Sequence, residues 1–223
     1  AQQEQRQFVA DSAHELRTPL TALNLQLQIL LEQFPHNNAL KNLSQGLLRM
    51  QHLVNQLLSL AKQDAVLSST EQLQILYLNH FTIQCIEQII QLAIQKGIDL
   101  GVIQQEDMLI LGQEAALHSI IYNLMDNAIK YTPSKGIINV SIFKKQGWAI
   151  LQVEDSGSGI DPAQFNQIRK RFYRIHNHAE IGSGLGLSIV DKAVERLGGQ
   201  LEFSRSASLG GLSVQVKFPL AAI

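Results

Sequence analysis

The sequence is poor in cysteine, in charge and in long apolar runs. Cys85 is the single cysteine of the 223 residues, which excludes a disulfide framework and a zinc site built from cysteines. Charged residues make up 17% and the net charge is −1, so the chain lacks the basic surface expected of a nucleic-acid-binding protein. No apolar run reaches the roughly 18 residues of a membrane span, and no signal peptide is visible.

The sequence does have enough apolar side chains to fill folded cores. Hydrophobic residues make up 45%, which argues against intrinsic disorder, and the length allows one large domain or two small ones. The chain begins at Ala1 without a methionine, so we expect it to be a portion of a longer protein. The missing part can hold membrane segments that this sequence lacks.

The first 66 residues have the pattern of two long amphipathic helices. Apolar residues recur at alternating steps of three and four, the heptad spacing of a helix–helix seam, and the segment 35–38 interrupts it with a proline. The seam residues are Val9, Ala13, Leu16, Leu20, Leu23, Leu27, Leu30 and Phe34, then Leu40, Leu43, Leu47, Met50, Val54, Leu57 and Ala61. So small a hairpin has little core of its own. We therefore expect it to dimerise into a four-helix bundle; the alternative is a monomeric hairpin packed on the second domain.

After a polar linker at 67–71, residues 72–223 alternate between strand and helix patterns. The predicted strands are 73–78, 98–103, 108–111, 137–143, 149–153, 200–206 and 212–218. The predicted helices are 81–95, 114–131 and 183–197, with a short helix after Asp161-Pro162. Strands joined partly as hairpins and partly through helices predict a mixed α/β sandwich, with one sheet and helices on one of its faces.

The first chemical motif is the run His14-Glu15-Leu16-Arg17-Thr18-Pro19 on the first predicted helix. His14 lies beside the seam and faces outward, where a neutral imidazole is a competent nucleophile. Glu15 can take the ring proton, and Thr18 is one turn further on the same face. Pro19 lacks the N–H that would bond back to Glu15, so the helix is expected to bend there. The alternative is an ordinary surface histidine.

The second motif lies on the helix predicted at 114–131. Asn123 and Asn127 share one face with Lys130 and Tyr131. An amide oxygen suits Mg²⁺ without adding negative charge near phosphates, and the lysine supplies a counter-charge for phosphate. The alternative is a pair of solvated amides.

Two glycine-rich motifs complete the set. Asp155 follows a predicted strand and precedes Gly157 and Gly159, and a carboxylate there can accept a hydrogen bond from an adenine amino group. The alternative is a turn rich in turn-forming residues. The fourth motif, 182–187, contains three glycines and opens a helix, whose free N–H groups suit phosphate oxygens. It matches neither a P-loop nor a dinucleotide-binding fingerprint.

Taken together, in this order and at these spacings, the four motifs resemble the H, N, G1 and G2 boxes of bacterial two-component sensor histidine kinases. The similarity covers nearly the whole chain. It implies a helical hairpin that forms a dimeric four-helix bundle, followed by an α/β sandwich of the GHKL ATPase type. The implied domains are a dimerisation and histidine phosphotransfer domain at 1–66 and a catalytic ATP-binding domain at 72–223. The implied location is the cytoplasmic portion of an inner-membrane protein.

The resemblance implies a role for each residue of the first motif. His14 would be the phosphorylated histidine, and Glu15 would be its general base. Thr18 matches the position that, in this family, orients water for dephosphorylating the partner regulator. The phosphoryl group would pass to an aspartate of a response regulator, so the implied partners are that regulator's receiver domain and a second copy of this chain.

The resemblance also implies a site for ATP and Mg²⁺. Asn127 would bind the metal ion, and Asp155 would recognise adenine. The other residues implied in nucleotide binding are Asn123, Lys130, Tyr131, Gly157, Gly159, Arg174, Gly182, Gly184, Leu185 and Gly186. Two rival functions stay open: a non-enzymatic dimeric scaffold with a nucleotide-sensing domain, and another GHKL ATPase such as a chaperone or a DNA-repair ATPase.

Two positions depart from the family pattern. Ala13 stands where serine is common before the histidine, which keeps the seam apolar. Arg169 stands where the F box usually has a phenylalanine, and Phe165, about one helical turn earlier, is a candidate replacement. The second departure puts the packing of the loop that follows, the lid over the nucleotide, in question.

Overall fold

The computed structural model describes residues 19–20, 22–35, 37–44, 46–47, 50, 72–175 and 184–221. The chain divides into two compact units, Ala1–Ser68 and Ser69–Ile223. No helix among the described residues is both long enough and apolar enough to cross a membrane.

In the first unit, residues 22–33 and 38–44 are helical, as the heptad pattern predicts. The second helix begins after Asn37, whose side-chain oxygen accepts hydrogen bonds from Ala39 N at 2.9 Å and Leu40 N at 3.3 Å. This is the N-cap arrangement that satisfies the first N–H groups of a helix. Pro19, where the helix was expected to bend, is the first described residue. The seam positions at 9, 13, 16, 54, 57 and 61 lie outside the described residues.

The leucines of the first seam divide into two classes. Leu20 and Leu27 are 5% and 4% exposed, whereas Leu23 and Leu30, which alternate with them, are 51% and 41% exposed. Phe34 is also exposed. A single hairpin thus covers only every second seam position.

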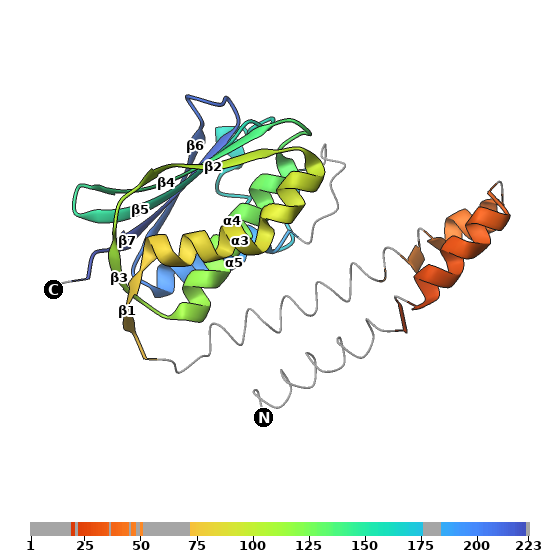
Figure 1. The fold of residues 1–223 in the computed structure, drawn as a ribbon, viewed down its shortest axis with the longest axis horizontal. Coiled ribbons are helices and arrows are strands. Elements are labelled where there is room, and N and C mark those ends of the chain that lie inside the picture. Colours follow the sequence, from red (N-terminus) through yellow and green to blue (C-terminus); the bar gives the residue numbers. More distant parts are fainter. Residues whose placement is uncertain are drawn as a thin grey trace. The chain divides into compact units, whose positions relative to one another are not determined.

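The described residues of the second unit form two sheets and three α-helices, which Figure 1 shows. In chain order its elements are β1 (Gln74–Tyr77), α3 (Leu78–Lys96), β2 (Asp99–Gln105), β3 (Leu109–Gly112), α4 (Glu114–Tyr131), β4 (Ile137–Lys145), β5 (Trp148–Asp155), η1 (Pro162–Gln164), α5 (Gly186–Arg196), β6 (Gln200–Arg205) and β7 (Leu212–Pro219). The larger sheet has the strand order β2-β4-β5-β7-β6, with β2 parallel to β4 and the other neighbours antiparallel.

The prediction of one sheet is wrong, because β1 and β3 form a separate two-stranded antiparallel sheet. Leu76 and Ile110 are buried while Ile75 and Leu111 are exposed, which is the alternation of any strand with one covered face. Since the same alternation serves a strand of either sheet, the sequence pattern cannot assign these strands to one or the other.

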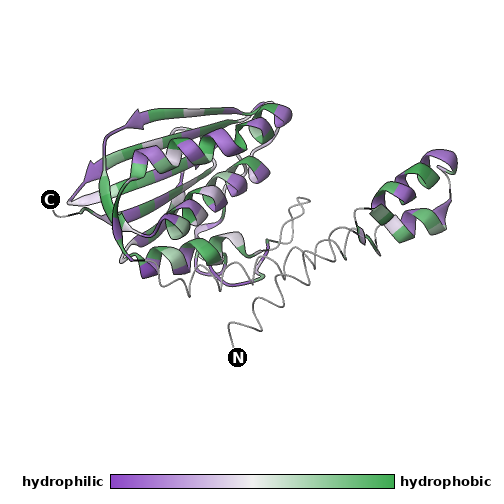
Figure 2. Ribbon diagram, turned by 60° about the horizontal axis from the view of Figure 1, so that its bottom comes forward, coloured by the Kyte–Doolittle hydropathy of each residue, from purple (hydrophilic) through white to green (hydrophobic). Residues whose placement is uncertain are grey.

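Helices α3, α4 and α5 lie on one face of the larger sheet, as predicted (Figure 1). Figure 2 shows hydrophobic and hydrophilic residues interleaved along these helices and strands, as expected for elements with one buried face. The core between helices and sheet contains large aliphatic side chains, among them Ile89, Leu117, Ile121, Met125, Ile138, Ile142, Leu151 and Val216.

Helix α4 has the predicted limits, 114–131, and ends before Thr132-Pro133. One prediction about helices needs correction, and another is confirmed. Helix α5 begins at Gly186 and not at 183, because Gly184 has a φ of 68°, a left-handed conformation that cannot continue a right-handed helix. The short helix after Asp161 is a single 3₁₀ turn, capped by the Asp161 carboxylate, which accepts from Ala163 N at 2.9 Å.

Candidate functional site

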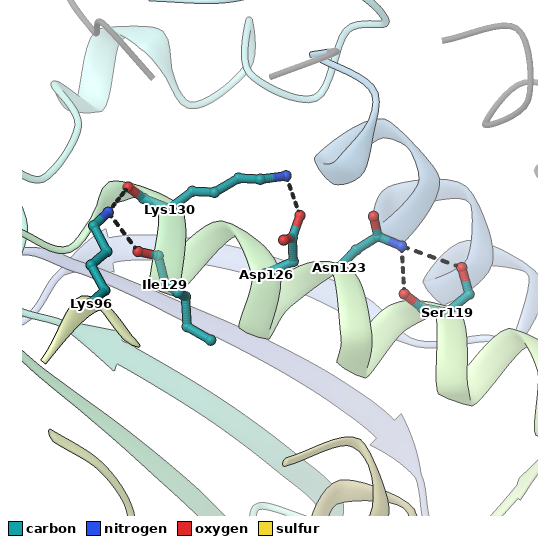
Figure 3. Close-up of polar contacts among 6 residues, drawn as sticks. All are labelled: Lys96, Ser119, Asn123, Asp126, Ile129 and Lys130. Atoms are coloured by element: carbon teal, nitrogen blue, oxygen red, sulfur yellow. Dashed lines mark hydrogen bonds and ion pairs between the residues drawn. The ribbon is translucent and has the colours of Figure 1, made fainter. Parts of the chain in front are cut away.

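The two asparagines of α4 lie against the N-terminus of α5. A Cβ atom placed on Gly186 would lie 3.1 Å from Asn127 Nδ2 and 3.3 Å from Asn123 Oδ1. Asn123 is held by its own helix, because its Nδ2 donates to Ser119 O at 2.7 Å (Figure 3). The glycine therefore permits the closest approach between the second and the fourth motif.

Asn127 is the asparagine that is left for a ligand. Its Nδ2 is buried and has no hydrogen-bond partner among the described residues. A buried amide without a partner costs free energy, so such a group is expected to have a bound ligand or water as its partner. Since a flip of the amide exchanges nitrogen and oxygen, this position can present either a donor or an oxygen ligand.

Lys130 lies one turn from Asp126 and forms an ion pair with it (Figure 3). Its charge is therefore partly balanced within α4 before any phosphate is bound. A second lysine, Lys96 at the end of α3, donates to Lys130 O at 2.6 Å and Ile129 O at 3.0 Å. Sequence reasoning missed this contact, in which a cation stabilises the carbonyl end of α4 and so fixes the end of the helix that carries the motif.

Asp155 ends β5 and is only 6% exposed. Its Oδ1 accepts two backbone hydrogen bonds, from Gly157 N at 2.8 Å and from Leu212 N at 3.1 Å. Burial raises the pKa of this carboxyl group above its ordinary value, and the two backbone hydrogen bonds oppose that rise. The side chain is thus a fixed acceptor in a largely dry setting, as hydrogen-bond recognition of a base requires.

The backbone around Asp155 is packed too tightly for side chains at two glycines. A Cβ on Gly157 would lie 2.6 Å from Tyr131 O, which brings the second and third motifs into contact. A Cβ on Gly211 would lie 2.3 Å from both Asp155 O and Asp155 Oδ1. Gly211 was not predicted; its only sequence signal is the pair Gly210-Gly211, which reads as an ordinary hairpin turn.

Near the fourth motif, the chain on either side of residues 173–183 is joined by a backbone hydrogen bond from Phe172 N to Gly184 O, at 2.9 Å. Phe172 itself has a φ of 63°. Leu185 is fully buried just before α5, whereas Arg174 is exposed. Gly159 has a φ of 70° and packs against Gly211.

Arg169, the departure in the F box, packs where an aromatic side chain was expected. Its Nη1 pairs with Asp191 Oδ1 at 2.6 Å, its Nη2 donates to Leu201 O at 2.5 Å, and its guanidinium lies 5.0 Å from the centre of the Phe203 ring. Phe165 also contacts Phe203, with ring centres 5.8 Å apart. Arg169 and Phe165 thus both pack on the Phe203 ring.

The predicted residues on α4, the end of β5, the loop after it and the start of α5 therefore converge. A hollow of about 450 Å³ lies elsewhere, next to Arg169, and none of the predicted nucleotide residues lines it. His14, Glu15, Thr18 and Gly182 lie outside the described residues. Within the described ranges, no group of three or more histidine, cysteine, aspartate or glutamate side chains is arranged to hold a metal ion.

Comparison with known proteins accounts for both units. Residues 4–66 match the His Kinase A (phospho-acceptor) domain, and residues 112–222 match the family of histidine kinase-, DNA gyrase B- and HSP90-like ATPases. The chain belongs to the sensor histidine kinases. A DNA gyrase or HSP90-like chaperone identity is excluded by the phospho-acceptor domain in front.

Named sensor histidine kinases align along nearly the whole chain. The swarming motility regulation sensor protein RssA of Serratia marcescens is 31% identical over 98% of this chain and 47% of its own length. The sensor protein QseC of Escherichia coli K12 is 33% identical over 96% of this chain and 47% of its own length. This chain therefore spans about half the length of these relatives. The mycobacterial sensor histidine kinase MprB has a solved structure with 25% identity and a TM-score of 0.60, over 68% of this chain and 99% of that one.

Proposed function

We propose that this chain uses Mg-ATP to phosphorylate its own His14 and passes the phosphoryl group to an aspartate of a response regulator. The observation that carries the proposal is that α4 contacts two of the other motifs. Asn127 lies against Gly186 at the start of α5, and Tyr131 lies against Gly157 in the loop after Asp155, in a chain whose first domain matches a phospho-acceptor domain. We also propose the reverse activity, dephosphorylation of the regulator, with Thr18 orienting the water.

In the nucleotide site, Asp155 accepts a hydrogen bond from the adenine amino group. The neighbouring glycines let the backbone pack closely around this carboxylate, and the N-terminus of α5 receives phosphate oxygens. The buried amide of Asn127 fits an oxygen-ligand position, so Asn127 would hold Mg²⁺, which would neutralise phosphate charge. Further contacts to the phosphates and the ribose come from Asn123, Lys130, Tyr131, Arg174, Gly182 and Gly184.

At the phospho-acceptor, the imidazole nitrogen of His14 attacks the γ-phosphorus. The bond from phosphorus to the bridging oxygen breaks, ADP leaves, and Glu15 takes the ring proton. Positioning supplies most of the rate enhancement, because little covalent chemistry is asked of the protein. Residues 1–66 and 72–223 act as separate domains in this proposal, and the linker 67–71 lets the second deliver the nucleotide to the first.

The partners we propose are a second copy of this chain and a response regulator. The exposed leucines Leu23 and Leu30, which lie on a heptad seam, support dimerisation, since burying them requires another helical surface. We further propose that the whole protein is a membrane sensor of which this chain is a cytoplasmic portion.

The test is labelling of the 223-residue chain with [γ-³²P]ATP and magnesium. The wild type should take up phosphate that is lost in acid and kept in alkali, as for a phosphoramidate. His14→Gln should abolish the label, and His52→Gln, a histidine elsewhere in the phospho-acceptor domain, should keep it. Label retained in His14→Gln would show that another residue is the nucleophile, and no label in the wild type would favour the non-enzymatic scaffold.

A further inference from the structure

The connection between β6 and β7, residues 206–211, is tied together by one buried serine. Ser206 Oγ donates to Glu154 Oε1 at 2.8 Å and accepts from Leu209 N at 3.0 Å. Its backbone closes the same turn, since Ser206 N donates to Gly211 O at 2.8 Å and Gly210 N donates to Ser206 O at 3.0 Å. Both the side chain and the main chain of Ser206 thus fix the path of this loop.

The loop path determines what reaches Asp155. Leu212 follows Gly211 directly, and its N–H donates to Asp155 Oδ1 at 3.1 Å. Gly157 N donates to the same oxygen at 2.8 Å. Within the described residues no hydrogen bond is found to Oδ2. The two backbone donors therefore hold the carboxylate in one orientation, with Oδ1 occupied and Oδ2 left to accept from a ligand.

Glu154 and Asp155 are neighbours on β5, so their side chains leave opposite faces of the strand. The chain from Ser206 to Leu212, the first residue of β7, is bonded to both. Ser206 donates to Glu154, and Leu212 N donates to Asp155. These two hydrogen bonds, on opposite faces of β5, fix both the position and the orientation of this segment, whereas one bond alone would leave its orientation free.

We propose that Ser206, acting through Glu154, is a positioning residue for adenine recognition. It holds the β6–β7 loop so that Leu212 N–H stays on Asp155 Oδ1, and the freed Oδ2 then selects nucleotides with a 6-amino group. The inference rests on the proposed function in so far as Asp155 is taken as the adenine acceptor.

A purely structural role for Ser206 predicts something different. Loosening the loop would then weaken every purine nucleotide equally. In the positioning role, loss of Ser206 weakens ATP, whose 6-amino group bonds to Asp155, and spares purine riboside triphosphate, which lacks that amino group. The ratio of the two dissociation constants separates the two roles.

The experiment measures both dissociation constants by calorimetry on the 223-residue chain. Ser206→Ala should lower the preference for ATP about five-fold, which corresponds to weakening, without losing, the hydrogen bond between the adenine amino group and the Asp155 carboxylate. Ser206→Thr keeps the hydroxyl and should restore the wild-type preference. Ser204→Ala, an exposed serine on the adjoining strand, is the matched control and should change neither constant.

The outcomes distinguish the inference from the function beneath it. A wild type that prefers ATP, with the same preference in folded Ser206→Ala, overturns the positioning role alone. A wild type that binds the two nucleotides equally overturns the assignment of Asp155 and the inference with it. Should Ser206→Ala not fold, Glu154→Ala removes the acceptor of the Ser206 hydroxyl instead. An unchanged preference in that variant also overturns the positioning role.

Discussion

Replacing Gly211 by alanine tests how tightly the carboxylate pocket is packed. The new Cβ would lie 2.3 Å from both the carbonyl and the Oδ1 oxygen of Asp155, roughly 1 Å or more inside normal contact distance. Neither oxygen can move freely, because Asp155 pairs with Ile138 of β4 and two backbone N–H groups donate to its Oδ1. Overpacking of this kind costs about 1–3 kcal/mol, and the strain falls on the atoms that orient Asp155.

We expect Gly211→Ala to lower the melting temperature of the second unit by about 3 °C for each kcal/mol and to weaken ATP binding at least about ten-fold, since small misplacements in a site are costly. Gly101→Ala is the matched control, because a Cβ at Gly101 has no atom within 4 Å among the described residues. Melting curves and titration with a fluorescent ATP analogue measure the two effects. Wild-type affinity and melting temperature in Gly211→Ala would refute this account of the packing.

Three further perturbations follow from the structure. Leu27→Ala leaves a cavity at a buried position within one hairpin and should lower the free energy of unfolding of that hairpin by about 2–5 kcal/mol. Leu30→Ala removes an exposed side chain and should mainly raise the dissociation constant of the proposed dimer, measured by sedimentation. Asp155→Asn keeps the Oδ1 acceptor but removes a buried charge. It should raise the melting temperature at pH 7 while abolishing ATP binding. The gain should shrink as the pH falls through the raised pKa of Asp155, because the wild-type carboxyl group then becomes neutral as well. Arg169→Met keeps the stem but leaves Asp191 unpaired, and should cost about 1 kcal/mol in urea unfolding, part of which the added change Asp191→Asn recovers.

The elements that the sequence predicted best have strong local signals. Helix α4 has both an apolar stripe and a proline just after its end, so its limits and the shared face of Asn123 and Asn127 follow from spacing alone. The break between the two helices of the hairpin also has a local signal, the proline in the segment 35–38.

The features that the sequence could not supply depend on contacts between distant segments. Gly211 is 56 residues from Asp155, and nothing in the local pattern of a glycine pair distinguishes a close approach from a turn. Arg169 reads as a lost aromatic residue until its contacts with Asp191 and Phe203, on two other elements, are seen. The start of α5 was misplaced because the left-handed Gly184 is fixed by its bond to Phe172.

The backbone hydrogen bond from Phe172 N to Gly184 O joins two positions that are twelve residues apart in the chain. Because this hydrogen bond fixes Phe172 next to Gly184, a change in chain length between them need not displace α5 or the sheet. Insertions between residues 175 and 184 should therefore leave the melting temperature nearly unchanged, so this stretch can diversify in length and composition while the sheet and helices beneath it keep their fold.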